Sequence, residues 1–224
     1  MADAGSARHA SSASPGPHLS PRVVTAARVR IVPDYIPFSQ ARRDETAAYA
    51  KRHYGVSTWQ LHPSMIVLHF TGSSSLSGAR DTFASNADNR GESPGTCAHY
   101  IVDRDGTVYA IVPTTVICRH AIGVNDRAIG IEMVQTGTSQ TGHWSDLQIL
   151  HRPAQIGAVL VLVRALQRQY SIRTSDVIGH AMVNASTQFR DLEGWTNDHV
   201  DWQPEDVAAV RERLGATVAS PSRR

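Results

Sequence analysis

The chain has 224 residues, enough for one domain of ordinary size with some residues left for tails. It is 41% hydrophobic and 19% charged, the composition of a soluble globular protein. The formal net charge is only +2, so we expect no nucleic-acid partner. No apolar run reaches the roughly 18–20 residues of a membrane span, so we expect no membrane-spanning segment.

The two ends of the chain differ in composition from its middle. Residues 1–22 are rich in Ala, Ser, Pro and His and have no apolar centre, which predicts a disordered tail and shows no secretory signal. Residues 216–224 (ATVASPSRR) predict a second disordered tail. One folded domain is therefore expected over residues 23–215, and no internal repeat is evident.

The first half of this domain predicts a helix, a strand and a second helix. Residues 40–54 form an Ala-rich helical segment that Gly55 ends as a C-cap. Residues 65–70 (MIVLHF) are a short apolar run typical of a buried strand. A Ser/Gly loop over residues 73–78 and a helix over residues 79–89 follow.

A hairpin is predicted next, because two β-rich runs at residues 99–102 and 108–112 flank the turn DRDG. Residues 128–134 (AIGIEMV) predict another buried strand, and residues 136–144 a Gly/Thr/Ser loop.

The last part of the domain again alternates helix and strand. Pro153 opens a helix with apolar residues at helical spacing, and residues 177–179 form a short strand. A long polar loop over residues 181–203 leads to a final helix that begins at Pro204. The pattern predicts a single α/β domain with a central mixed β-sheet flanked by helices.

The two cysteines, Cys97 and Cys118, leave two interpretations open. They form one disulfide if the protein folds in an oxidising compartment, or they are two buried free thiols.

Three polar residues lie in or at the end of apolar strands. His69 ends MIVLHF, His180 follows VIG, and Glu132 lies inside AIGIEMV. A buried ionisable group is costly unless something pairs with it, so these residues suggest a shared pocket. Taken alone, each histidine is more simply explained as a hydrogen-bonded core residue.

A hydrolytic zinc site takes three protein ligands and a water. No HExxH motif is present, so the ligands of such a site would come from separate segments. A Ser-His hydrolase is disfavoured because no Gly-x-Ser-x-Gly elbow exists.

Five segments in order resemble the zinc-dependent N-acetylmuramoyl-L-alanine amidase family, which includes phage-type lysozyme amidases and peptidoglycan recognition proteins. The resemblance covers residues 60–214 and is carried by IVLHFTGSS, CAHYIVDRDGTVYAIVP, CRHAIG, AIGIEMV and VIGH. It implies a Zn²⁺ site with His69 and His180 as ligands, Glu132 as the general base, and His120 in the substrate cleft.

The third ligand lies where this sequence departs from the family. Relatives have a short loop of the form Lys-x-Asp-Pro-Gly or Lys-x-Cys, whereas this chain reads FRDLEGWTNDHVDW and offers Asp191, Asp198, His199 and Asp201. A basic residue two positions before the ligand is reproduced by His199-Val200-Asp201. The resemblance therefore implies Asp201 as ligand and protonated His199 as the group that stabilises the oxyanion, with His199 as ligand the second choice.

The function that the resemblance implies is hydrolysis of the amide bond between N-acetylmuramic acid and L-alanine in peptidoglycan or muropeptides. The alternative is a non-catalytic peptidoglycan-binding recognition module of the same fold. We expect a secreted or cell-wall-associated monomer. The remaining histidines are predicted to be structural (His99) or on the surface (His53, His62, His143 and His151).

Overall fold

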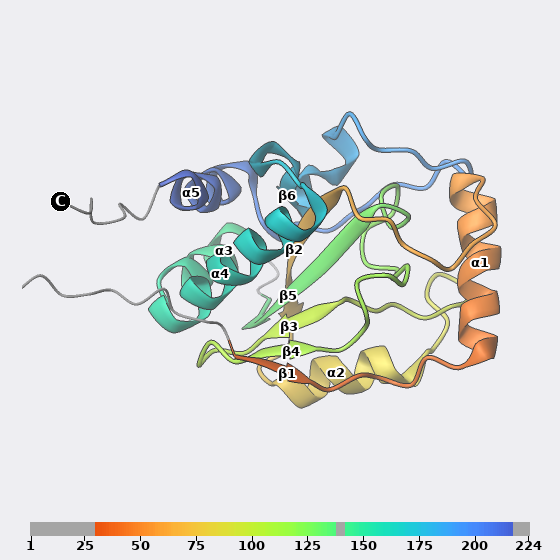
Figure 1. The fold of residues 1–224 in the computed structure, drawn as a ribbon, viewed down its shortest axis with the longest axis horizontal. Coiled ribbons are helices and arrows are strands. Elements are labelled where there is room, and N and C mark those ends of the chain that lie inside the picture. Colours follow the sequence, from red (N-terminus) through yellow and green to blue (C-terminus); the bar gives the residue numbers. More distant parts are fainter. Residues whose placement is uncertain (1–29, 138–141, 217–224) are drawn as a thin grey trace, which may run out of the picture.

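Six strands form one mixed sheet in the computed structural model, which describes residues 30–137 and 142–216 (Figure 1). The strands are β1 (Ile31–Pro33), β2 (Met65–Gly72), β3 (Tyr100–Val102), β4 (Val108–Ala110), β5 (Ala128–Thr136) and β6 (Val177–Gly179). Their order across the sheet is β1-β4-β3-β5-β2-β6, and each neighbouring pair is parallel except the β3–β4 hairpin. The expected α/β domain with a central mixed sheet is confirmed.

Helices cover the sheet, and three of them gather on one face (Figure 1). The helices are α1 (Gln40–Tyr54), α2 (Leu76–Ser85), α3 (Gly142–Leu150), α4 (Pro153–Tyr170) and α5 (Pro204–Gly215), with 3-10 turns at Thr174–Asp176 and His180–Ala185. α3, α4 and α5 contact one another and the strands β5, β3 and β6 respectively.

Strands β2 and β5 are buried on both faces over most of their length, which explains why their sequences are continuous apolar runs. Side chains alternate between the faces of a strand. Ile66 and Leu68 pack in the cluster that contains the α3, α4 and α5 residues, whereas Met65 and Val67 belong to a separate cluster. By this alternation His69 lies on the face away from the three packed helices.

Most predicted elements are confirmed, and the differences have local causes. α2 begins at Leu76, inside the expected loop, because the Ser75 side chain accepts a hydrogen bond from the backbone of Gly78. Of the loop predicted over residues 136–144, residues 138–141 lie outside the described residues, Thr136 ends β5, and residues 142–144 begin α3, a helix that the sequence did not predict. Strand β1 was not predicted, since it is short and lies at the sheet edge.

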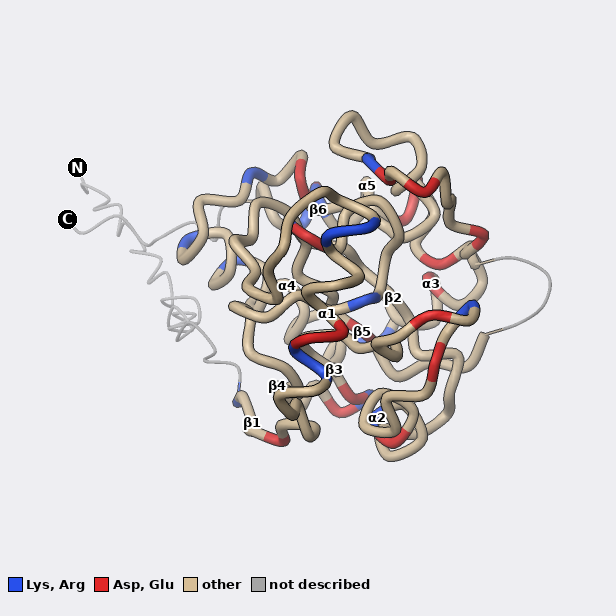
Figure 2. Tube along the Cα trace, turned by 90° about the vertical axis from the view of Figure 1, so that its right-hand side faces the viewer, with Lys and Arg blue, Asp and Glu red and all other residues tan. Residues whose placement is uncertain are grey.

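The tail predicted at residues 1–22 and, apart from Ala216, the tail predicted at residues 216–224 lie outside the described residues. Among the residues that the structure does describe, no single helix has the length and apolarity to cross a membrane, although α3 and α4, bent by 91°, meet the criterion as a pair. Basic and acidic residues are interspersed along the described chain, as the small net charge leads one to expect (Figure 2).

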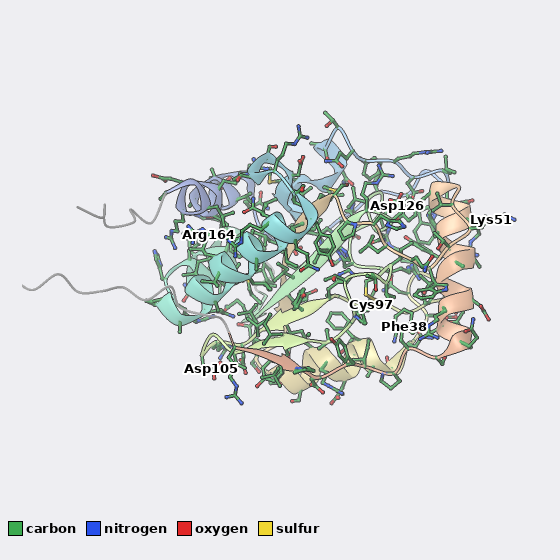
Figure 3. The ribbon with its side chains drawn as sticks, in the orientation of Figure 1. Phe38, Lys51, Cys97, Asp105, Asp126 and Arg164 are labelled. Atoms are coloured by element: carbon green, nitrogen blue, oxygen red, sulfur yellow. A yellow bond between two sulfur atoms is a disulfide. The ribbon has the colours of Figure 1, made fainter. Side chains whose placement is uncertain are left out.

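Cys97 and Cys118 form a disulfide, which decides between the two interpretations of the sequence. Both residues are buried in the cluster that includes Ile101 of β3 (Cys97 is labelled in Figure 3). The bridge closes a loop with a sequence separation of 21 residues around the β3–β4 hairpin.

Removing this cross-link is expected to destabilise the fold through the unfolded state. A loop of this length corresponds to about 3 kcal/mol of lost chain entropy in the denatured ensemble. Urea unfolding of the Cys97→Ser/Cys118→Ser variant should give a free energy of unfolding lower by about that amount than the oxidised wild type. Equal free energies would contradict this role for the bridge.

Candidate metal centre

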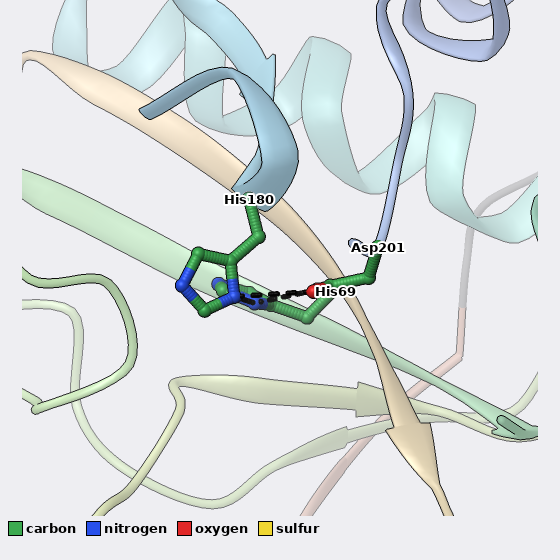
Figure 4. Close-up of side chains that lie close together, drawn as sticks. All are labelled: His69, His180 and Asp201. Atoms are coloured by element: carbon green, nitrogen blue, oxygen red, sulfur yellow. Dashed lines mark hydrogen bonds and ion pairs between the residues drawn. The ribbon is translucent and has the colours of Figure 1, made fainter. Parts of the chain in front are cut away.

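Two imidazoles and one carboxylate meet at one edge of the sheet (Figure 4). His69 Nδ1 lies 3.1 Å from His180 Nδ1 and 3.1 Å from Asp201 Oδ2, and His180 Nδ1 lies 3.3 Å from Asp201 Oδ1. All three residues are buried. Three residues that the sequence places far apart therefore form one compact cluster.

The sheet topology brings the two histidines together. β2 and β6 are adjacent and parallel, with Leu68 opposite Gly179. The residue that follows each of these positions is a histidine, so His69, within β2, and His180, directly after β6, lie side by side. Asp201 joins them from the segment before α5, where its carbonyl oxygen accepts a hydrogen bond of 2.9 Å from the backbone N–H of Ala181.

The proton of His69 is fixed by a chain of hydrogen bonds through His120. His120 Nε2 lies 3.2 Å from the carbonyl oxygen of Ala128, which can only accept, so Nε2 carries the His120 proton. His120 Nδ1 is then an acceptor, and it lies 3.0 Å from His69 Nε2. His69 therefore carries its proton on Nε2 and presents the lone pair of Nδ1 to the cluster.

His180 is fixed in the same tautomer by Asn197. The Asn197 side-chain oxygen accepts a hydrogen bond from the backbone of Ile122, and its amide nitrogen donates to the carbonyl oxygen of Ile122, which orients the amide. This oxygen lies 2.9 Å from His180 Nε2, so Nε2 donates. His180 also presents the lone pair of Nδ1.

The cluster thus consists of acceptors with no proton left to share. Burial lowers the pKa of His69 to about 4, which keeps this imidazole neutral. The two oxygens of the Asp201 carboxyl group face the two Nδ1 atoms. Two neutral imidazoles and a carboxylate are a donor set that suits zinc, so the residues fit the metal.

Glu132 lies beside this cluster because of strand register. It is directly opposite His69 on the neighbouring parallel strand, and directly opposite residues of adjacent strands point to the same face. Its side chain is buried, and Oε2 has no hydrogen-bond partner among the described residues. Burial, with a smaller effect of Asp201, raises the pKa of Glu132 to about 8.

The other three candidates for the third ligand do not contact both buried histidines. Asp198 is exposed and pairs with Arg90 at 3.2 Å, and the buried Asp191 carboxylate lies 2.7 Å from His53. His199 is largely exposed and stacks on His180, with its Nδ1 3.9 Å from Asp201 Oδ1. Asp201 is the member of the four that contacts both buried histidines.

One sequence expectation needs correction, and one residue of the site was not predicted. His53 was predicted to lie on the surface, but it is completely buried between the carboxylates of Asp191 and Glu92, because the long loop folds back over α1. His120 lines the cavity as expected, yet both ring nitrogens are engaged by His69 and Ala128. Asn197 was missed, since an asparagine in a polar loop carries no sequence signal of its own.

A cavity of about 270 Å³ opens over the cluster. Glu132, His199 and the three clustered residues line it together with polar residues of the flanking loops, including Asn89, Arg90, Arg119, Asn125 and Asn197. The cavity therefore joins the three clustered residues to a surface that is rich in hydrogen-bonding side chains.

Behind the cluster, His99 is a structural residue. The backbone N–H of Gly130 donates to its Nδ1 at 2.9 Å, and its Nε2 donates to the carbonyl oxygen of Val116 at 2.9 Å. Burial lowers the pKa of His99 to about 4. Protonation of Nδ1 would break the hydrogen bond from Gly130. His99 is therefore neutral in the folded protein.

Comparison with known proteins identifies similar sequences and folds. A family profile described as N-acetylmuramoyl-L-alanine amidase matches residues 59–201. The amidase LysC from Clostridium intestinale URNW is 22% identical, with 81% of this chain and 97% of that chain covered and a TM-score of 0.51. A mutant endolysin from Bacillus subtilis is 15% identical over 84% of this chain and all of that chain, also with a TM-score of 0.51. Comparison with curated protein sequences gives no match.

The neutral state of His99 makes the metal-free protein sensitive to acid. Between pH 6.5 and pH 4 the unfolded chain binds a proton at this histidine and the folded chain does not, so stability is lost as pH falls through this window. His99→Gln keeps a donor for Val116 and does not titrate. Urea unfolding at pH 7 and pH 4.5 should show a loss about 2 kcal/mol smaller in this variant than in wild type. Parallel losses in the two proteins would show that His99 is not the titrating group.

Proposed function

The chain belongs to the N-acetylmuramoyl-L-alanine amidase family, and we propose that it hydrolyses the amide bond between N-acetylmuramic acid and L-alanine of peptidoglycan, with zinc held by His69, His180 and Asp201. One observation carries the metal-dependent part of this proposal. The lone pairs of two imidazoles and a carboxylate converge within 3.3 Å of one another, and the ring protons are engaged elsewhere. A bound cation would stabilise such a cluster of acceptors.

Zinc bound there would supply a Lewis acid that polarises the scissile carbonyl and makes a water molecule more acidic. The remaining chemistry belongs to the side chains around the cavity. Neutral His69 is already in the protonation state that metal binding requires, because burial lowers its pKa.

We assign Glu132 the role of general base. Its Oε2 is free to accept the proton of an attacking water, and its pKa of about 8 lies near neutral pH, where proton transfer in both directions is efficient. A cation beside it would favour the ionised form that accepts the proton. The same oxygen then holds the proton that the leaving alanine amine needs.

We assign His199 the role of a hydrogen-bond donor to the developing oxyanion. It stands at the cavity rim, stacked on His180 with 4.3 Å between ring centroids. Partial desolvation at the cavity rim lowers the pKa of His199, so we propose that it acts as a neutral N–H donor, whereas the resemblance implied the protonated form.

The alternative function is a recognition module of the same fold that binds peptidoglycan without cutting it. Binding alone needs neither a complete ligand set nor a buried, unpaired carboxylate beside it, since an unsatisfied buried carboxylate costs stability. The combination of these features supports the enzyme. Because the substrate lies in the cell wall, we propose a secreted or wall-associated monomer whose amidase domain spans residues 23–215.

The ligand assignment is tested by zinc content. His69→Ala, His180→Ala and Asp201→Ala should each lose the zinc that wild type carries, since each removes one of three protein ligands. His199→Ala should keep its zinc. Elemental analysis of the purified variants measures both results.

Asp198→Asn is the matched control, because it changes a carboxylate of the same loop that pairs with Arg90 on the surface. If Asp201→Ala keeps its zinc and His199→Ala loses it, then His199 is the ligand and Asp201 is not. A wild-type protein that binds no zinc and cuts nothing would favour the recognition module.

The role of Glu132 is tested by Glu132→Gln. This variant should keep its zinc but release peptide from purified peptidoglycan about 10²–10⁴ times more slowly, the usual contribution of a general base. Glu212→Gln, at an exposed position of α5, should leave the rate unchanged. A Glu132→Gln rate within a few-fold of wild type would remove Glu132 from the mechanism.

A further inference from the structure

The backbone on either side of Asp201 packs closely against two glycines, where any larger residue would collide with it. A Cβ atom at Gly142, the first residue of α3, would collide with the carbonyl oxygen of Val200. A Cβ atom at Gly179, the last residue of β6, would collide with the carbonyl oxygen of Trp202. Asp201 therefore lies on a short stretch of backbone that is confined from both sides.

Trp202, the next residue, has a strained backbone. Its φ is +60°, in the left-handed region that non-glycine residues adopt at a cost of about 1–2 kcal/mol, and its side chain is completely buried. Such a conformation persists only when surrounding contacts impose it. The conformation of Trp202 matters because it sets the direction in which the chain leaves Asp201.

The buried carboxylate of Asp146 supplies these contacts. Asp146, on α3, accepts a hydrogen bond of 3.0 Å from the backbone N–H of Trp202 through Oδ1, and one of 2.9 Å from that of Gln203 through Oδ2. The residue is completely buried. Both oxygens are used on the two residues that directly follow Asp201, so this carboxylate determines the path of the backbone there.

We infer that Asp146 is a positioning residue for the metal centre, which holds the left-handed turn at Trp202 and thereby keeps the Asp201 carboxylate against His69 and His180. The inference rests on the proposed zinc site. It assigns Asp146 no contact with metal or substrate, since it acts through the backbone of residues 202 and 203.

The test is the zinc affinity of variants, measured by competition with a chromophoric chelator on purified, metal-free protein. Asp146→Ala should raise the Kd for Zn²⁺ about 10- to 100-fold, the usual effect of losing a group that orients a metal ligand. Asp146→Asn keeps one accepting oxygen but turns an amide N–H₂ toward the second backbone donor, so an intermediate rise in Kd is expected. This milder variant decides the question if Asp146→Ala does not fold.

Asp191→Ala is the matched control. The Asp191 side chain is also buried and also accepts two backbone hydrogen bonds, from Glu193 and Trp195 at 3.0 Å each, in the loop that leads to Asp201. It should lower thermal stability and leave the Kd for Zn²⁺ within about 2-fold of wild type, because it does not touch the residues next to Asp201.

Three outcomes separate the claims. Wild-type affinity in both Asp146 variants would overturn the positioning role while leaving the zinc site intact. An equal rise in Kd in Asp191→Ala would also overturn it, because the effect would then follow general loss of stability. Absence of zinc binding by wild type would instead refute the proposed metal centre on which the inference rests.

Discussion

The Nδ1 atoms of His69 and His180 lie 3.1 Å apart, and both face the carboxylate of Asp201. Groups that present only lone pairs repel one another, so this arrangement persists only because the surrounding structure imposes it. His120 accepts a hydrogen bond from Nε2 of His69, and Asn197 accepts one from Nε2 of His180. The backbone next to Asp201 is held by hydrogen bonds to Asp146. A cation would convert the mutual repulsion into attraction.

The sheet supplies the geometry on which this cluster depends. Parallel pairing of β2 with β6 sets the two histidines side by side, and parallel pairing with β5 sets Glu132 opposite His69. Alternation along β2 directs His69 away from the face where α3, α4 and α5 pack. The apolar strands thus provide the base of the site, and residues of the loops line the cavity above it.

Much of this arrangement could be predicted from the sequence. Strands β2 and β6 could be predicted because apolar β-rich runs have a clear pattern, and α1, α4 and α5 because of their caps and apolar spacing. The contacts of Asn197 and Asp146 could not be predicted, since they join segments that only the folded chain brings together. The same holds for His53, whose burial depends on a loop that begins more than a hundred residues later.

The central claim is that both histidines direct Nδ1 toward the metal and carry their remaining proton on Nε2. Long-range ¹H–¹⁵N NMR of the zinc-loaded protein, with histidine labelled on its ring nitrogens, measures this directly. The account predicts the Nε2–H tautomer for His69 and for His180, with the Nδ1 resonance of each shifted by the metal. A proton on Nδ1 of either residue would contradict it, because His120 or Asn197 would then not be orienting a zinc ligand.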